Sequence, residues 1–219
     1  MDFTGLRQIA AQLSHPEGED GIRTGQEMHT NNGEMTRRAI DLLQCCDEEH
    51  ILEIGQGSGA HVPYLLAKAT ALFYEGIDIS ETMTVLAGEL NAAEVQAGRV
   101  RFVQGEGLLL PWPDNTFDRV FTVNTLYFWA DPQAQLAGIQ RVLKPGGSFL
   151  LAFRSRNFME KLPFTGFGEF RLYNMEDGIE LLEKNGFRVQ ERIYEKEETF
   201  SILQETLEKD RVLLRAVKI

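Results

Sequence analysis

The sequence predicts an α/β protein built on a doubly wound, mostly parallel sheet of seven strands, one of them antiparallel, with helices on both faces. Three observations support this fold class. Short apolar runs alternate with helix-like segments from residue 35 to residue 190. A glycine-rich turn at 55–59 follows the first apolar run, and two strand-like segments close the chain. Strands that alternate with helices favour a parallel sheet, because each helix returns the chain to the edge where the strands begin.

The expected strands are short runs rich in apolar and β-branched residues, bounded by turn-forming residues. The last two are separated only by a short polar stretch with helical character, so one of them is free to run antiparallel. In chain order the seven strands are expected at residues 50–55, 71–80, 99–106, 117–129, 148–155, 187–199 and 211–219.

The helices expected between these strands carry start and stop signals. Pro63 suits a first helical turn, and Ser80 is a candidate N-cap. Gly146 and Gly186 each follow the end of an expected helix, where glycine is favoured. The helices are expected at residues 35–45, 61–70, 81–96, 131–144 and 175–186.

Residues 1–34 are polar and contain several glycines, so we expect an N-terminal extension with a short helix at 3–13 followed by a loop. Residues 35–219 are expected to form one domain, because a chain of 219 residues is long enough to bury a core of its own. No internal repeat or low-complexity linker divides this part of the sequence.

Composition argues against several classes of function. The net charge of −11 argues against a nucleic-acid partner, because phosphate binding needs a basic surface. No apolar run approaches the roughly 20 residues of a membrane span, and the N-terminus lacks the pattern of a secretory signal. Cys45 and Cys46 are adjacent and cannot build a disulfide framework, which favours a cytoplasmic location. The four histidines show no ligand spacing, so no metal site is expected.

The turn in "ILEIGQGSGAHV" is typical of a nucleotide- or anion-binding turn between a strand and a helix. Glycines let a ligand approach the backbone, and the helix N-terminus offers free N–H groups. Gly55, Gly57 and Ala60 also satisfy the dinucleotide pattern G-x-G-x-x-G/A, and Asp78 lies at a suitable distance for a ribose hydroxyl. The glycines and Asp78 are therefore compatible with a nicotinamide cofactor and with another adenosine-containing cofactor.

Two acids favour the second of these choices. Glu53 lies in a mostly buried strand, where a carboxylate is costly unless it meets donors or a positive charge. A pyrophosphate would be repelled there, whereas an ammonium group would be attracted. Glu106 follows the third expected strand, at the place where an adenine amino group would be read. The acidic run at Glu195–Glu198 is interpreted as a solvated edge without function.

Four stretches in order resemble the class I S-adenosylmethionine-dependent methyltransferases, in particular their small-molecule branch, which includes ubiquinone- and menaquinone-biosynthesis enzymes. These stretches are "ILEIGQGSG", "GIDIS", "LPWPDNTFDRVF" and "RVLKPGGSFLLAFR". The resemblance covers about residues 35–190. It implies a Rossmann-like seven-stranded sheet with one antiparallel strand and S-adenosylmethionine as cofactor.

The resemblance also assigns site residues. Gly55, Gly57 and Gly59 would wrap the methionine part of the cofactor, and Glu53 would hold its amino group. Asp78 would bind both ribose hydroxyls, and Asn124 would face the cofactor through its backbone. Glu106 would meet the adenine N6 where the family usually shows aspartate. The complete set of expected cofactor contacts is Glu53, Gly55, Gln56, Gly57, Gly59, Asp78, Ile79, Met83, Glu106, Gly107 and Asn124.

The N-terminal block would close over the cofactor as a lid, with Gln26, Met28 and His29 as contacts, because some family members open with a similar block. His29 and Tyr127 are the candidate catalytic residues, whereas His15, His50 and His61 are interpreted as bystanders. Tyr127, Trp129 and Arg154 are the expected acceptor contacts. An apolar acceptor is favoured by the phenylalanines at 158, 164, 167 and 170, and Arg154 and Arg156 are candidates for an acidic group.

These observations predict a methyltransferase that moves a methyl group to a small-molecule acceptor by in-line displacement. A non-catalytic cofactor- or partner-binding module of the same fold is an alternative, since fold does not fix function. A nicotinamide oxidoreductase is a further alternative; it predicts a Tyr-x-x-x-Lys or comparable hydride-site pair, and the Tyr194–Glu198 spacing lacks the lysine. The acceptor atom and the oligomeric state are not readable from the sequence.

Overall fold

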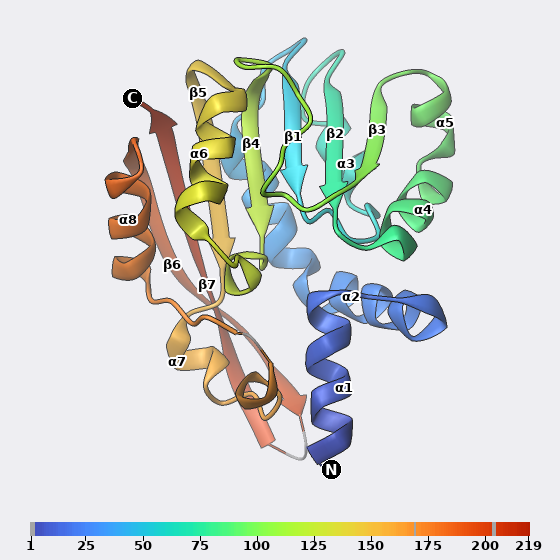
Figure 1. Cartoon of the computed structure of the whole chain (residues 1–219), viewed down its shortest axis with the longest axis vertical. Helices are drawn as coiled ribbons and strands as arrows, with labels where there is room; N and C mark the ends of the chain where they lie inside the picture. Colours follow the sequence, from blue (N-terminus) through green and yellow to red (C-terminus); the bar gives the residue numbers. More distant parts are fainter. Residues whose placement is uncertain (1–2, 169, 203–204) are drawn as a thin grey trace.

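The computed structural model describes residues 3–168, 170–202 and 205–219 and shows a seven-stranded sheet with strand order β3-β2-β1-β4-β5-β7-β6 (Figure 1). Strands β1 to β5 are parallel, and β7 runs antiparallel to both of its neighbours. The predicted fold class is therefore confirmed. The strands are β1 His50–Ile54, β2 Phe73–Asp78, β3 Val100–Gln104, β4 Phe117–Val123, β5 Leu143–Phe153, β6 Phe187–Ile202 and β7 Glu205–Lys218.

Helices cover both faces of the sheet, with α6 and α8 in front of it and α2 and α3 behind it in the view of Figure 1. Two short 3₁₀ turns, η1 Leu126–Phe128 and η2 Thr165–Phe167, follow β4 and α7. The α-helices are α1 Phe3–Ser14, α2 Gly18–Leu43, α3 Val62–Leu66, α4 Glu81–Leu90, α5 Ala92–Gln96, α6 Pro132–Val142, α7 Arg156–Met159 and α8 Met175–Lys184.

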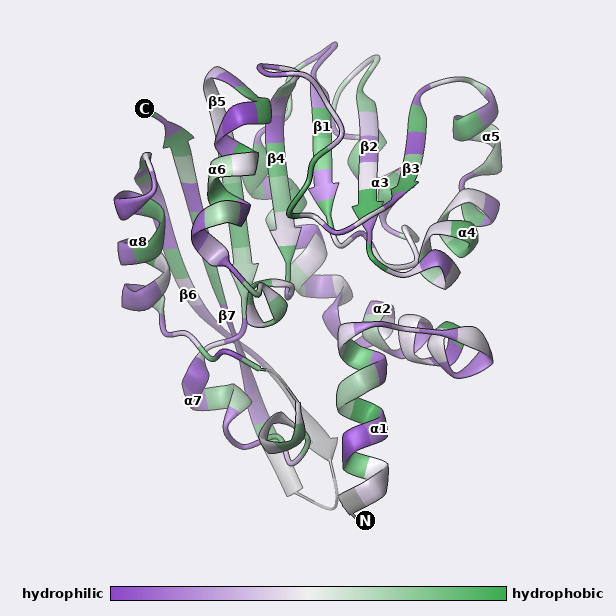
Figure 2. Cartoon of the chain, in the orientation of Figure 1, coloured by the Kyte–Doolittle hydropathy of each residue, from purple (hydrophilic) through white to green (hydrophobic). Residues whose placement is uncertain are grey.

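The core consists of two apolar layers that the strands separate. Successive strand side chains point to opposite faces, so Ile51 packs with the helices behind the sheet and Leu52 with those in front. Both side chains are fully buried. In Figure 2 hydrophobic residues run along the strands, whereas the side of α8 that faces away from the sheet is hydrophilic. The parallel strands are thus apolar on both faces, as buried parallel strands generally are.

The predicted loop between residues 14 and 34 is wrong, because α2 is one continuous helix from Gly18 to Leu43. The proposed domain boundary at residue 34 falls inside this helix. Two glycines explain why a polar segment packs as a helix here. A Cβ on Gly25 would lie 2.6 Å from the sulfur of Met83, and one on Gly21 would lie 2.7 Å from the backbone of Pro16. Only glycine allows these close approaches.

Several other predicted boundaries differ from the structure, including that of the strand expected at 117–129, which ends at Val123. The helix expected at 81–96 is divided at Asn91, whose side-chain amide donates to the carbonyls of Gly59 and Ala87. The helix expected at 61–70 is only five residues long. The helical stretch expected between the last two strands is absent from the described residues, because β7 already begins at Glu205 and pairs with β6.

The β6–β7 hairpin extends past the carboxyl ends of the parallel strands and reaches the level of α1 and α7 (Figure 1). It is tied to α2, because Arg38 pairs with Glu195 at 3.0 Å and Lys209 donates to the carbonyl of Asn31. In the part of the chain that the structure describes, no helix is long and apolar enough to cross a membrane.

Candidate active site

The glycine turn lies at the carboxyl end of β1, beside the point where the strand order changes direction between β1 and β4. Ligands of open α/β sheets bind at this crevice. Gly55 and Gly57 have φ values of +75° and +55°, which favour glycine. A Cβ on Gly55 would lie only 2.4 Å from the methyl carbon of Thr125, whereas Gly57 faces open space. The turn therefore presents bare backbone toward the space beyond the strands.

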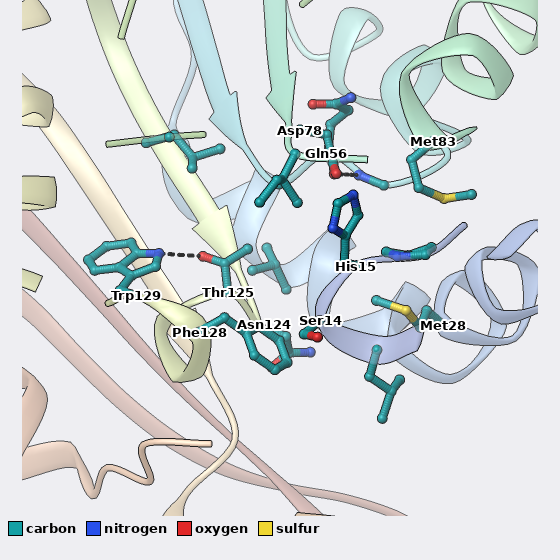
Figure 3. A pocket seen from close by; sticks show the side chains of 18 of the residues that line it. Ser14, His15, Met28, Gln56, Asp78, Met83, Asn124, Thr125, Phe128 and Trp129 are labelled. Carbon is teal, nitrogen blue, oxygen red and sulfur yellow. Dashed lines mark hydrogen bonds between the residues drawn. The ribbon is translucent and has the colours of Figure 1, made fainter. Parts of the chain in front are cut away.

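A cavity of about 700 Å³ lies beyond this turn (Figure 3), and we call it the first cavity. It is enclosed by the turn, by the end of β2, by the segment after β3, by η1 and by α1 and α2. It collects most of the predicted cofactor contacts, namely Glu53, Gly55, Gln56, Gly57, Asp78, Ile79, Met83, Glu106, Gly107 and Asn124. Gly59 is not among its lining residues and instead packs against Ala87 of α4.

Asp78 closes β2 and anchors the glycine turn. Its carboxylate accepts hydrogen bonds from the backbone N–H groups of Gly57 and Ser80, each at 2.9 Å. Burial raises the pKa of Asp78, and the two N–H donors oppose that rise. Figure 3 shows His15, which follows α1, pointing toward Asp78 across the cavity. The Asp78 side chain is thus held at the cavity wall by hydrogen bonds that also order the glycine turn.

Glu53 is 2% exposed and lines the same cavity from β1. Its Oε2 accepts a hydrogen bond from the Tyr74 hydroxyl and lies 2.6 Å from Nε2 of His61. Burial, followed by the neighbouring Glu53 charge, raises the pKa of Tyr74 well above its usual range, so the phenol stays protonated and donates. His61, interpreted from the sequence as a bystander, lines the cavity and contacts Glu53.

Gln56 lies in the glycine turn with its side chain packed on Gly76 of β2. The side chain is buried, and neither its Nε2 nor its Oε1 has a hydrogen-bond partner within the described ranges. A buried amide without partners is costly. Together with the two carboxylates and the open backbone at Gly57, it makes a polar site that fits a nucleoside-type ligand carrying several donors and acceptors.

The segment after β3 forms the opposite rim. Gly107 is required by a close approach, because a Cβ there would lie 2.7 Å from Nε2 of Gln135, which donates to the Gly107 carbonyl. Glu106 and Ile79 are exposed and lie at the cavity mouth. Met83 is buried and packs against Gly25 of α2.

A second cavity of about 860 Å³ adjoins the first. It lies between α1, α2, η1 and the segment that carries α7. It contains three of the four predicted phenylalanines, Phe158, Phe164 and Phe170, whereas Phe167 lines the first cavity. The residues common to both cavities are Ala11, Leu13, Met28, Asn32, Asn124 and Phe128.

Tyr127 and Arg154 line the second cavity and are buried. The Tyr127 hydroxyl accepts from the Arg154 backbone N–H and lies 3.1 Å from Oδ1 of Asn124, to which it can donate. Burial raises the pKa of Tyr127 well above its usual range, so the hydroxyl is a poor base near neutral pH. Trp129 lies on the first cavity instead, with its indole N–H on the Thr125 hydroxyl at 3.2 Å (Figure 3).

The Arg154 guanidinium is held by an ion pair to Glu197 at 2.9 Å and by a bond to Asn32 at 3.2 Å. The interpretation of the acidic run as a solvated edge is therefore wrong for Glu197, whose side chain is 6% exposed, and for Glu195, which pairs with Arg211 at 2.7 Å. The side chain of Glu198 lies outside the described residues. The expected role of Arg154 toward an acidic acceptor stays a prediction.

The remaining predicted residues are distributed as follows. His29 lines the first cavity, and burial, then the charges of His61 and Arg37, lower its pKa. Gln26 lines neither cavity. Arg156 pairs with Asp177 at 3.2 Å and lines neither. Among the residues that the structure describes, no cluster of three or more His, Cys, Asp or Glu is arranged to hold a metal ion.

This fold and this cavity are typical of α/β enzymes that bind a nucleoside-type cofactor at the switch point of the sheet, here between β1 and β4. Comparison with known proteins identifies the family. The methyltransferase domain family matches residues 52–151. An uncharacterized methyltransferase of Bacillus subtilis, YdaC, is 32% identical over 132 residues, which are 60% of this chain and 71% of the relative. A demethylmenaquinone methyltransferase of Thermus thermophilus is 31% identical over 154 residues, 62% of this chain and 69% of the relative.

A solved structure of another protein has the same fold. A structure described as an S-adenosylmethionine-dependent methyltransferase from Aquifex aeolicus superimposes with a TM-score of 0.64 at 19% identity, covering 100% of both chains. The chain belongs to the class I S-adenosylmethionine-dependent methyltransferases of the small-molecule type. The family suggested by the four sequence motifs is thus confirmed.

Proposed function

We propose that this methyltransferase transfers a methyl group from S-adenosylmethionine in the first cavity to a small-molecule acceptor in the second. The observation that carries the proposal is that the two cavities meet. A polar chamber with two buried carboxylates adjoins an aromatic chamber across a boundary that includes Met28, Asn32, Asn124 and Phe128. Donor and acceptor held on either side of that boundary would face each other.

The proposed cofactor contacts follow from charge and position. Asp78 is at the end of β2, where it would accept from both ribose hydroxyls. Glu53 would accept from the amino group, and Glu106 at the mouth would meet the adenine amino group. The buried amide of Gln56, which has no partner within the described ranges, would gain one. Support comes from the lining of the first cavity, which contains all four side chains.

When bound, S-adenosylmethionine supplies a sulfonium methyl group that an acceptor atom can displace in line. The protein's part is to align the two reactants and exclude water, which can supply several kcal/mol of the barrier. None of the residues shared by both cavities has a titratable side chain. His29, in the first cavity, is the candidate base for acceptors that must lose a proton, and its lowered pKa keeps it neutral for that role.

We propose an apolar, aromatic-sized acceptor, because Tyr127, Phe128, Phe158, Phe164 and Phe170 surround the second cavity. The rings of Tyr127, Phe128, Phe164 and Phe170 pack on one another, with 5.0 Å between the centroids of Phe128 and Phe170. The charge of Arg154 is already matched by Glu197, so this side chain offers no free cation to an acidic acceptor. The Thermus relative is named a demethylmenaquinone methyltransferase, which supports a small-molecule acceptor.

Residues 1–34 would act as the lid that closes both cavities. Support comes from the lining, because α1 contributes Leu13 and the first half of α2 contributes Met28 and Asn32 to both. The hydroxyl of Ser80 at the start of α4 donates to the carbonyl of Pro16, which holds the α1–α2 corner at the cavity rim.

Calorimetry with S-adenosylmethionine, S-adenosylhomocysteine and NADH tests the proposal. We expect micromolar binding of the first two and none of NADH. Asp78→Asn should lower both affinities at least tenfold, whereas Asp114→Asn, an exposed carboxylate paired with Arg141, should leave them unchanged. A mass-based screen of apolar phenols, acids and quinols then reports methyl transfer. Binding of NADH alone would refute the cofactor, and tight cofactor binding without any transfer would favour the non-catalytic module.

A further inference from the structure

Three of the chain's four histidines line the first cavity, although they come from three separate elements. His15 follows α1, His29 lies on α2, and His61 precedes α3. The fourth, His50, begins β1 at the other end of the strand and stacks on Phe73 with 4.8 Å between ring centroids. A cavity for a cationic cofactor is an unusual place to gather imidazoles, because each becomes a cation at moderately acidic pH.

The hydrogen bonds of Glu53 determine which ring nitrogen of His61 carries a hydrogen. An ionised carboxylate only accepts, so Nε2 of His61 carries the hydrogen on the 2.6 Å contact with Oε2. The Tyr74 hydroxyl occupies the same oxygen. The other oxygen, Oε1, has no hydrogen-bond partner in the described part of the chain, and Glu53 lines the cavity. Oε1 is thus the atom that remains for a ligand.

The charge of this pair depends on Nδ1 of His61, for which the described residues provide no partner either. When Nδ1 is unprotonated, Glu53 and His61 together carry one negative charge, which attracts an ammonium group. With Nδ1 protonated, the pair is neutral and a buried imidazolium faces the ligand. The other titratable groups around it are Tyr74 on β2, Asp78 at its end, and His29 on α2 with Arg37 beyond.

We infer that His61 sets the charge of the subsite for the cofactor's amino group, so that protonation of His61 weakens binding of any cofactor form that carries this group. The inference rests on the proposed function, since it assumes that S-adenosylmethionine occupies the first cavity. Below the pH at which His61 protonates, each bound ligand must release one proton to solvent. The dissociation constant then rises up to about tenfold for each pH unit of acidification.

A ligand pair isolates the amino-group subsite. S-adenosylhomocysteine carries the ammonium group, whereas 5′-methylthioadenosine retains the nucleoside and the sulfur but lacks the amino-acid part. We expect calorimetry between pH 5.5 and 8.5 to show weakening of S-adenosylhomocysteine on acidification and nearly constant affinity for 5′-methylthioadenosine. Equal pH dependence of the two ligands in the wild-type protein would overturn the inference without affecting the proposed function, and this comparison needs no variant that folds.

Variants then assign the proton to one side chain. His61→Gln keeps an N–H donor for Glu53 but cannot protonate, so its affinity for S-adenosylhomocysteine should vary less than threefold over the same range. His50→Gln is the matched control and should behave as wild type. Retention of the full pH dependence in His61→Gln, or its loss in His29→Gln or His15→Gln instead, would overturn the assignment to His61. Failure of both ligands to bind at any pH would refute the proposed function and this inference with it.

Discussion

Substitution of Gly55 by alanine tests whether the glycine turn is held open by a single close contact. The new Cβ would carry two separable penalties. A residue with a side chain at φ +75° costs about 1–2 kcal/mol, as left-handed backbone generally does. The Cβ would also lie 2.4 Å from Cγ2 of Thr125, and overpacking of a tight site costs about 1–3 kcal/mol more. The expected loss in the free energy of unfolding is therefore about 2–5 kcal/mol.

Thr125→Ser separates the two penalties. It removes the offending methyl group but keeps the hydroxyl that accepts from Trp129. In the Thr125→Ser background, Gly55→Ala should lower the free energy of unfolding only by the penalty for a side chain at positive φ, about 1–2 kcal/mol. Gly57→Ala is a second control, because its φ of +55° is also positive but its Cβ would meet nothing within 4 Å. It should lose stability by a similar small amount while weakening cofactor binding.

Urea unfolding, compared at constant slope, measures all four variants. The coupling between Gly55→Ala and Thr125→Ser should be about 1–3 kcal/mol, well above the roughly 0.5 kcal/mol seen for independent sites. Additive costs would refute the reasoning, since they would mean that the Thr125 methyl group does not constrain the turn.

Other substitutions test contacts elsewhere in the fold. Ser80→Ala removes the N-cap of α4 and should lower the free energy of unfolding by about 1–2 kcal/mol, measured by urea unfolding. Glu197→Gln leaves Arg154 buried without its carboxylate and should lower the free energy of unfolding by about 3–5 kcal/mol. Arg154→Met should cost less, because Glu197 keeps its pairs with Lys209 and Arg211. Equal losses of the two variants in thermal unfolding would contradict this reasoning. For Asp118, burial is the largest single influence and opposes ionisation, but the bonds from Lys144 and the His50 backbone N–H, with the charges of both residues, together lower the pKa. These contacts therefore stabilise the fold above about pH 4 and are lost as pH falls through the lowered value. Asp118→Asn should therefore lie below wild type in stability at pH 7 and converge with it in acid, as followed by fluorescence across a pH series.

The parallel sheet and the gathering of the expected cofactor contacts around one cavity were predictable, because their signals are local. The strands are continuous apolar runs, and the glycine turn and Asp78 follow directly from strand ends. The start of α2 was not predictable in this way. Residues 18–34 are polar with four glycines, and they form a helix because Gly21 and Gly25 let it pack closely on Pro16 and Met83, contacts that no local pattern displays.

The same limit applies to contacts of the site that the sequence did not reveal. His61 is eight residues from Glu53, and a strand, a turn and a change of direction bring their side chains together. Glu197 is 43 residues from Arg154, so its burial depends on how the hairpin crosses the end of β5. A run of acids in a sequence suggests a solvated edge, because the basic side chains that pair with it in the fold are not adjacent to it in the sequence.

The unequal lengths of the strands have a consequence for how such an enzyme changes over generations. β6 has 16 residues and β7 has 14, against five to seven in β1 to β4. The surplus length, with α1 and the α7 segment, forms a rim that stands apart from the parallel strands. Together with α2 this rim lines most of the second cavity, to which the hairpin itself contributes Lys209. If the second cavity holds the acceptor, as we propose, insertions or replacements in that rim would change which molecule is methylated and leave the strand ends proposed to hold the methyl donor unchanged.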